Sequence, residues 1–296
     1  MELRAHLESI DKNSAKIILA VAGCVPKIKE SFFRGAEISG TQNIYGENQI
    51  ELDKNADEII ISALKKSGLV KQIASEEQPN AIDVPNASAG YAVTLDPLDG
   101  SSCVKTNLAV GTIVGIYRTP NVLQQGKNLC AAFYILYGPI TTLVYAAGNG
   151  VHEFALNEKS QFILRTENLK IGSDKIYAPG GTADKYLPAH RKWMDALSAR
   201  GYKIRFSGSF VADCNQILHY GGVFTYPGLV GKEGGKLRLL FEGNPLSFII
   251  ANAGGSSSNG KISLLEVIPE KIDQRVPVYV GGKEEIALIE KFFKEA

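Results

Sequence analysis

The sequence predicts a mixed α/β protein in which helices are layered against sheets in two halves. Three patterns indicate this: apolar residues at helical spacing near the N-terminus, closely spaced strand-like runs over 91–165, and alternating helices and strands after that region. A polar stretch, RTENLKIGSD (165–174), separates the last two patterns. We therefore expect an N-terminal half over 1–168 and a C-terminal half over 169–296.

The N-terminal half begins with a pattern that predicts one or two helices, interrupted at Pro26. Residues 39–52, SGTQNIYGENQIEL, are typical of a loop. Residues 53–68 predict a longer helix, because acids crowd its start, lysines lie in its last turn and Gly68 can end it. The apolar residues of the first pattern are Leu3, Leu7, Ile10, Ile17, Ile18 and Val21.

Several strand-like runs follow, and glycine, proline or asparagine separates most of them. Because the runs lie close together in the sequence, we expect a mainly antiparallel meander. The runs are 91–96, 109–117, 130–138, 140–147 and 151–156.

The C-terminal half alternates between helices and strands. Asn244 and Pro245 predict the start of one helix, with the asparagine as its cap. The expected helices lie near 183–200, 210–220, 244–254 and 284–294, and the expected strands lie at 202–206 and 222–226.

Composition and charge exclude several classes of protein. A net charge of +1 over 296 residues provides no overall field for nucleic acid or for an anionic membrane, so we expect neither as a partner. No apolar run is long enough to span a bilayer, and the N-terminus lacks the order of a signal peptide. The cysteines and histidines have no zinc-type spacing. We therefore expect a cytoplasmic protein.

The stretch LDPLDGSS (95–102) places two acids around a proline turn. Such a turn can bring Asp96 and Asp99 to one side, with the Leu98 carbonyl between them. These are hard oxygen ligands, which suit Mg²⁺ or Mn²⁺ better than zinc. Taken alone, an Asp-Pro-x-Asp-Gly stretch is also compatible with an ordinary turn.

The same stretch continues with residues that suit an anion. Gly100 lets backbone N–H groups approach a ligand closely, and Ser101 and Ser102 add hydroxyl donors. Acids repel phosphate, but bound metals neutralise the acids, so that phosphate can bind the metal and the backbone together.

Two other segments supply further acids. Glu76 and Glu77 follow a short apolar run, and Glu47 and Asp53 precede a predicted helix. Taken alone, Glu76 and Glu77 are better explained as part of a solvated surface, and Glu47 and Asp53 are compatible with favourable placement of acids near a helix N-terminus. Together, acids from three segments suit a metal-dependent phosphate hydrolase, in which one metal orients the phosphate and another lowers the pKa of the attacking water.

In that order, GENQIELD, SEE and DPLDGSS resemble the lithium-sensitive, Mg²⁺-dependent sugar phosphatase superfamily. The stretches RFSGSFVADCNQIL, GGVFTYP and GKLRLLFEGNPLSFIIANAGG resemble its sedoheptulose-1,7-bisphosphatase and fructose-1,6-bisphosphatase branch. This resemblance covers nearly the whole chain, from about Gly46 to about Lys291. It implies two sheet-and-helix halves in an α-β-α-β-α arrangement.

The resemblance also implies roles for individual residues. Two or three Mg²⁺ ions, with Mn²⁺ as a substitute, would be held by Glu76, Glu77, Asp96, Asp99, Glu242 and the Leu98 carbonyl. Asp53 and Glu77 would position and deprotonate the attacking water, and Glu47 would order a loop. The cleaved phosphate would contact Asp99, Gly100, Ser101 and Ser102, with Arg238 near the scissile end. The distal phosphate would contact Arg205, Tyr226 and Lys236.

Within the family, the counterpart of Arg205 comes from a neighbouring subunit, which implies a homo-oligomer, either a dimer or a tetramer. The expected substrate is sedoheptulose 1,7-bisphosphate, cleaved at its 1-phosphate. Fructose 1,6-bisphosphate, or use of both sugars, is the alternative, because one extra hydroxymethylene changes binding only modestly.

The chain departs from the family in places that bear on substrate choice and regulation. A family asparagine at the distal phosphate is missing, since the stretch here contains Gly180 and Gly181, and a family tyrosine is Phe206. The family's AMP site and redox cysteines have no counterpart, so we expect neither kind of control.

Two remote alternatives stay open. An inositol phosphatase would carry a late Trp-Asp pair, whereas Trp193 here is followed by Met194. A catalytically silent sugar-phosphate-binding homologue is the other alternative.

Overall fold

Side chains that alternate along the strands of a large sheet face two different hydrophobic cores. In β5 (Tyr91–Asp99), Val93 and Leu95 belong to one core and Ala92 belongs to the other. Both faces of the sheet are covered, so every residue of β5 is buried. The structure, a computed structural model, describes residues 1–32, 38–42 and 48–295, of which 38–42 and 48–50 are described by their backbone alone.

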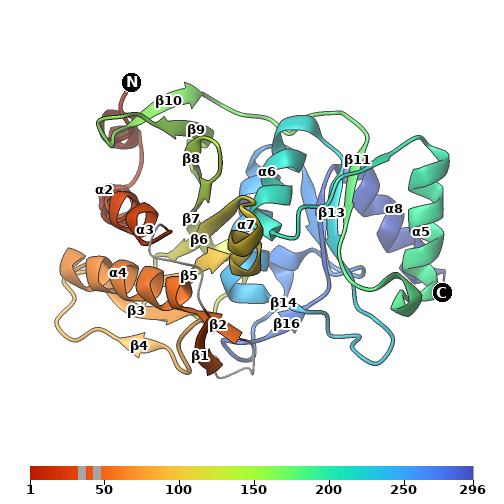
Figure 1. Cartoon of the computed structure of the whole chain (residues 1–296), viewed down its shortest axis with the longest axis horizontal. Coiled ribbons are helices and arrows are strands. Elements are labelled where there is room, and N and C mark those ends of the chain that lie inside the picture. Colours follow the sequence, from red (N-terminus) through yellow and green to blue (C-terminus); the bar gives the residue numbers. More distant parts are fainter. Residues whose placement is uncertain (33–37, 43–47, 296) are drawn as a thin grey trace.

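Helices from the N-terminal segment cover the first face of this sheet (Figure 1). They are α1 (Leu3–His6), α2 (Lys12–Ala22), α3 (Val25–Phe32) and α4 (Glu51–Ser67). Pro26 is the second residue of α3. The first N–H groups of a helix have no carbonyl partner within the helix, so a proline is tolerated there, and Pro26 lies at the start of a new helix. The helix predicted over 53–68 is confirmed as α4, which begins two residues earlier.

The prediction of a loop over 39–52 was wrong in its described parts. The strands β1 (Ile38–Gln42) and β2 (Asn48–Ile50) pair antiparallel, and α4 begins directly after β2. These strands are short, and loop-type residues such as glycine and asparagine dominate the segment, so it contains no alternating apolar pattern.

The large sheet has eight strands in the order β10-β9-β8-β7-β6-β5-β3-β4. The predicted antiparallel meander is confirmed from β5 to β10. In contrast, β3 pairs parallel with β5, so the carboxyl ends of these two strands meet at the same edge. The other strands of the sheet are β3 (Val70–Ser75), β4 (Ile82–Asp83), β6 (Val110–Tyr117), β7 (Leu129–Tyr137), β8 (Thr141–Ala147), β9 (Gly150–Leu156) and β10 (Phe162–Thr166).

A middle layer of two helices lies between this sheet and a second one (Figure 1). The helices are α6 (Phe210–Tyr220) and α7 (Asn244–Asn252). The second sheet has the order β12-β11-β13-β17-β15, and α5 (Pro188–Ala199) and α8 (Lys283–Lys294) cover its outer face. Its strands are β11 (Ile176–Pro179), β12 (Lys203–Ile204), β13 (Val223–Tyr226), β15 (Ser256–Ser258) and β17 (Val278–Gly281).

The five layers confirm the predicted α-β-α-β-α arrangement, and the two sheets span 70–166 and 176–281. The division after residue 168 stays a prediction. Asn244 is not the cap of α7, because a π-helical turn, Leu239–Gly243, runs directly into that helix and places Asn244 inside it. Among the described residues, no helix is long and apolar enough to cross a membrane.

Candidate active site

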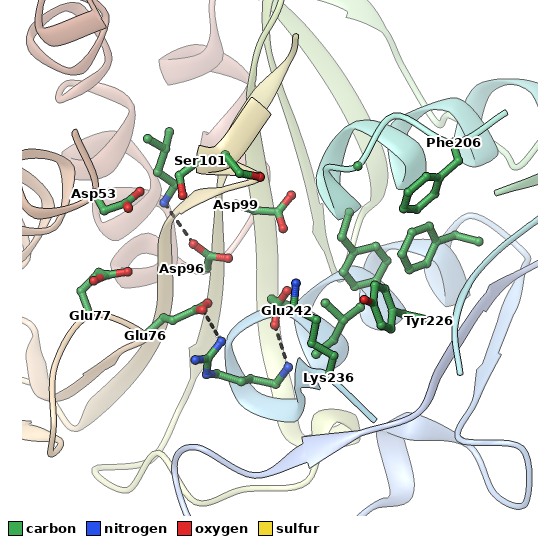
Figure 2. A pocket seen from close by; sticks show the side chains of 18 residues that line it. Asp53, Glu76, Glu77, Asp96, Asp99, Ser101, Phe206, Tyr226, Lys236 and Glu242 are labelled. Atoms are coloured by element: carbon green, nitrogen blue, oxygen red, sulfur yellow. Dashed lines mark hydrogen bonds and ion pairs between the residues drawn. The ribbon is translucent and has the colours of Figure 1, made fainter. Parts of the chain in front are cut away.

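The DPLD turn at the end of β5 forms the floor of a cleft of about 300 Å³. The turn is held from within, since the Leu98 amide donates a hydrogen bond to Asp96 Oδ1 at 3.0 Å. It is also held from the neighbouring strand, where Thr112 Oγ1 donates to the Pro97 carbonyl at 2.9 Å. As a result, Asp96 and Asp99 both face the cleft (Figure 2).

The second acidic segment reaches the same cleft because β3 runs parallel to β5. The chain turns directly after β3, and the Glu76 amide donates to the Leu95 carbonyl of β5 at 3.0 Å. Glu76 and Glu77 therefore project from one wall of the cleft, beside Asp53 of α4 (Figure 2).

The third acidic segment is the π-helical turn before α7, and it carries Glu242 into the cleft (Figure 2). Its Oε2 accepts a hydrogen bond from the Arg238 amide at 2.6 Å, and the Arg238 guanidinium forms an ion pair with Glu76. One oxygen each of Glu76, Asp96 and Glu242 lie within 4.8 Å of one another. Three distant segments of the chain thus place carboxylates around a common point.

The electrostatics of this cluster fit a divalent cation. Burial raises the pKa of Asp96 well above its usual range, and the neighbouring charge of Glu76 raises it further. The pKa of Glu242 is raised for the same two reasons, again with burial as the largest. Buried carboxylates that oppose one another's ionisation are stabilised by cations, and an all-oxygen donor set matches Mg²⁺ or Mn²⁺.

Asp99 differs from the other acids in having two donors from the C-terminal half of the chain. Ser209 Oγ and the Val211 amide donate to Asp99 Oδ2 at 2.9 and 2.8 Å. Burial nevertheless raises the pKa of Asp99 to about 6, against the lowering effect of these two bonds. Gly100 follows with φ +77°, and a Cβ there would lie 2.4 Å from the Cβ of Ser209, so only glycine fits this approach of the two halves.

The side of the cleft formed by Tyr226 and Phe206 carries a lysine beside aromatic rings. Lys236 Nζ lies 5.6 Å from the centre of the Tyr226 ring, and Phe206 lines the same side (Figure 2). Gly180 packs against Tyr226, since a Cβ at this glycine would be 2.5 Å from the ring. Gly180, in the stretch that lacks the family asparagine, therefore leaves the space that the Tyr226 ring occupies.

The structure brings most of the predicted residues together and leaves Arg205 apart. The residues that line the cleft are Asp53, Glu76, Glu77, Asp96, Leu98, Asp99, Gly100, Ser101, Ser102, Tyr226, Lys236, Arg238 and Glu242. Arg205 does not line the cleft of its own chain; it is exposed, with its guanidinium carbon 5.3 Å from the centre of the Tyr220 ring. Glu47 lies outside the described residues.

Sequence reasoning missed the residues that hold the acids from behind. Ser209 is the N-cap of α6, and its side chain also accepts from the Ala212 amide at 3.4 Å. A serine directly before a predicted helix signals a cap, but nothing in the local pattern connects it to an acid 110 positions away. The apolar lining residues Phe210, Phe224 and Leu237 were missed for the same reason.

The chain is similar to known proteins over nearly its full length. Two family models match the chain, "Fructose-1-6-bisphosphatase, N-terminal domain" over residues 7–167 and "Fructose-1-6-bisphosphatase, C-terminal domain" over residues 171–294. The chain is 49% identical to the class 1 fructose-1,6-bisphosphatase of Methanocorpusculum labreanum over 275 residues, which is 93% of this chain and 85% of that protein. It is 44% identical to that of Geobacter sulfurreducens, with 99% of this chain and 95% of that protein covered.

A solved structure matches the fold over almost its full length. The holo form of Leishmania major fructose-1,6-bisphosphatase superposes with a TM-score of 0.94 at 28% identity and covers 99% of both chains.

Proposed function

The chain belongs to the fructose-1,6-bisphosphatase family, and on that premise we propose that it hydrolyses the 1-phosphate of fructose 1,6-bisphosphate. As a member of this family it is a phosphoric monoester hydrolase that acts on a sugar bisphosphate. The products are fructose 6-phosphate and inorganic phosphate.

One observation carries the proposal: a single cleft holds a cluster of carboxylates and, on the side of Tyr226, a lysine (Figure 2). A sugar bisphosphate carries two dianions separated by a sugar. The phosphate to be cleaved needs cations that stabilise its transition state, whereas the other phosphate needs only an anchor. The carboxylate cluster and the lysine match these two requirements.

Fructose 1,6-bisphosphate is favoured over the expected sedoheptulose 1,7-bisphosphate by the relatives. Eight relatives that are 43–49% identical over nearly the full chain are named class 1 fructose-1,6-bisphosphatases. Fructose 1,6-bisphosphate is therefore the main proposal for the substrate.

We propose that Mg²⁺ is held by Glu76, Glu77, Asp96, Asp99 and Glu242, together with the Leu98 carbonyl. Support comes from the crowding of these buried acids around one point. When bound, the metal would neutralise the phosphate oxygens and lower the pKa of water in the site. Arg238, which already pairs with Glu76, supplies a fixed positive charge close to the same phosphate.

The residues of the chain would then carry out a simple displacement. Glu77 and Asp53, on the same wall of the cleft, accept the proton of the water that attacks phosphorus (Figure 2). The bond between phosphorus and the bridging oxygen breaks, and its electron pair stays on the sugar oxygen, which takes up a proton. Gly100, Ser101 and Ser102 provide backbone and hydroxyl donors for the released phosphate.

The distal phosphate would be held by Lys236 and the Tyr226 hydroxyl, with Arg205 supplied by a second subunit. Support for the second subunit is that Arg205 is exposed and outside the cleft of its own chain. In a homo-oligomer, Arg205 of one subunit would reach the distal phosphate in the cleft of its neighbour.

A phosphate-release assay tests the proposed function. We expect fructose 1,6-bisphosphate to be hydrolysed with Mg²⁺ and not with EDTA, and to have the highest kcat/KM in a panel that includes sedoheptulose 1,7-bisphosphate and inositol monophosphate. Glu77→Gln should lower kcat by at least about 100-fold, because it removes a proton acceptor. Glu58→Gln, an exposed position on the same helix as Asp53, serves as the matched control.

A higher kcat/KM for the seven-carbon sugar would restore the first expectation. Sugar-phosphate binding that is equally tight with and without Mg²⁺, with no phosphate release, would overturn the enzymatic proposal.

A further inference from the structure

The turn that carries Glu76 and Glu77 is held at both of its ends by one carboxylate behind it. Ser75, the last residue of β3, starts the turn, and the Gln78 amide closes it by donating to the Ser75 carbonyl at 3.2 Å. The two glutamates are the middle residues of this turn, so their direction depends on how its ends are fixed.

Asp57 is the residue that fixes both ends. Its Oδ1 accepts a hydrogen bond from Ser75 Oγ at 2.5 Å, and its Oδ2 accepts one from Gln78 Nε2 at 2.5 Å. It lies in α4 one helical turn after Asp53, so the same helix face supports both the turn and an acid of the cleft. Asp57 is 1% exposed.

We propose that Asp57 is a positioning residue for metal binding, which acts by holding the turn Ser75–Gln78 so that Glu76 and Glu77 face the same ion. This inference rests on the proposed function, since it assigns the support of that metal site. Groups that orient metal ligands from behind commonly affect metal affinity by an order of magnitude or more.

The geometry separates this role from that of a ligand. Asp57 does not line the cleft, and each of its two oxygens already accepts a hydrogen bond from the turn. Burial raises its pKa, and the two bonds from Ser75 and Gln78 lower it, so these donors are what favour the charged form in a buried place.

Direct binding of Mn²⁺ to the full-length protein, followed by electron paramagnetic resonance of the free ion, tests the proposal without depending on turnover. Asp57→Ala removes both acceptors, and we expect its Mn²⁺ affinity to fall about 10-fold. Asp57→Asn should keep both bonds, because its amide oxygen can accept from Ser75 and its amide nitrogen can donate to Gln78 once that side chain turns its oxygen inward.

Leu64→Ala is the control for a purely structural effect. Leu64 lies in the same helix, is fully buried in the core and has no hydrogen bond to the turn, so its loss weakens the helix without releasing the glutamates. We expect Asp57→Asn and Leu64→Ala to stay within about twofold of the wild type in Mn²⁺ affinity. At saturating Mg²⁺, the KM of Asp57→Ala for the sugar should also match the wild type, because Lys236 and Tyr226 are untouched.

Equal Mn²⁺ affinity of Asp57→Ala and Leu64→Ala would overturn the proposal. If Asp57→Ala does not fold, Gln78→Ala replaces it as the test, because Gln78 is half-buried and its loss frees one end of the turn. An unchanged Mn²⁺ affinity of Gln78→Ala would contradict the proposed role of Asp57. A wild-type protein that binds no Mn²⁺ would reject the proposed function and this role together. A wild-type enzyme that binds Mn²⁺, with variants unaffected, would reject this role alone.

Discussion

The buried acids of the cleft lower the stability of the folded chain when they are ionised. Burial, followed by the neighbouring charge of Glu76, raises the pKa of both Asp96 and Glu242 and so favours their neutral forms. A group whose pKa is higher in the folded state than in the unfolded state lowers stability once it is ionised. The arrangement that suits a cation therefore costs stability when no cation is bound.

This conflict predicts that Asp96→Asn raises the melting temperature in EDTA. The asparagine oxygen can keep the hydrogen bond from the Leu98 amide, while the charge that opposes Glu76 and Glu242 is removed. The same variant should lose both phosphatase activity and the stabilisation by Mg²⁺ that the wild type shows. Differential scanning fluorimetry with EDTA and with Mg²⁺ measures both effects, and a lower melting temperature in EDTA would contradict this reasoning.

Residue types and spacing indicated Asp53, Glu76, Glu77, Asp96 and Asp99 as candidate acids, because they follow strands or precede a helix, whereas Glu242 was expected only from the resemblance to the family. The partners behind them were not predictable in this way. Ser209 and Asp57 are identified only by contacts with Asp99 and with Ser75, and these contacts span 110 and 18 positions. A hydrogen bond between distant segments leaves no periodic trace in either one.

Among the elements, α6 joins the two sheets through a second contact that responds to pH. His219 Nε2 lies 3.2 Å from Glu153 Oε1 of β9, and its Nδ1 lies 2.9 Å from the Asn215 carbonyl oxygen. Both neighbours are acceptors, so both ring nitrogens need a proton. The hydrogen bond to Glu153 consequently raises the pKa of His219 above its ordinary value of 6.5, although burial and Arg165 act in the opposite direction.

The sign of the resulting pH dependence follows from this raised pKa. The contribution of His219 to the free energy of unfolding should be fully present below pH 6.5 and should be lost as the pH rises through the folded-state pKa. The stability difference between wild type and His219→Gln should therefore be larger at about pH 5.5 than at about pH 9. Urea denaturation at both pH values measures it, and an equal or reversed difference would show that the pair does not act in this way.

The elements that were predicted correctly are those with strong local patterns. The runs in β5 to β9 are nearly continuous and apolar, as expected of strands that are buried on both faces. The strands β4, β12, β14 (Leu237–Arg238) and β16 (Arg275–Val276) contain two residues each, which is too short for any periodicity to show. Their positions depend on the neighbours with which they pair.

For the molecule as a whole, the exposed position of Arg205 leads to a test of assembly. If a second subunit supplies this arginine, a site with Glu77 from one chain and Arg205 from its partner is complete. Mixing subunits of Glu77→Gln and Arg205→Ala should therefore restore activity at limiting substrate, compared with either variant alone. Reversible dissociation and reassembly of the two proteins, followed by the phosphate-release assay, measures this recovery.

The control for that experiment pairs two acids from one cleft. Glu77→Gln mixed with Asp53→Asn should not recover, because both residues line the cleft of the same chain and no hybrid site is complete. Absence of recovery with Arg205→Ala would indicate that each chain uses its own arginine. Recovery in the control would contradict the assignment of Glu77 and Asp53 to the cleft of one chain.

The middle layer of the molecule has a consequence for synthesis on the ribosome. The eight-stranded sheet ends at Thr166, but α6 and α7, which cover its inner face, are translated only afterwards, and α7 ends at Asn252. A nascent chain therefore carries an uncovered apolar sheet face until most of its length has emerged, and in this interval that face is open to aggregation and to chaperone binding.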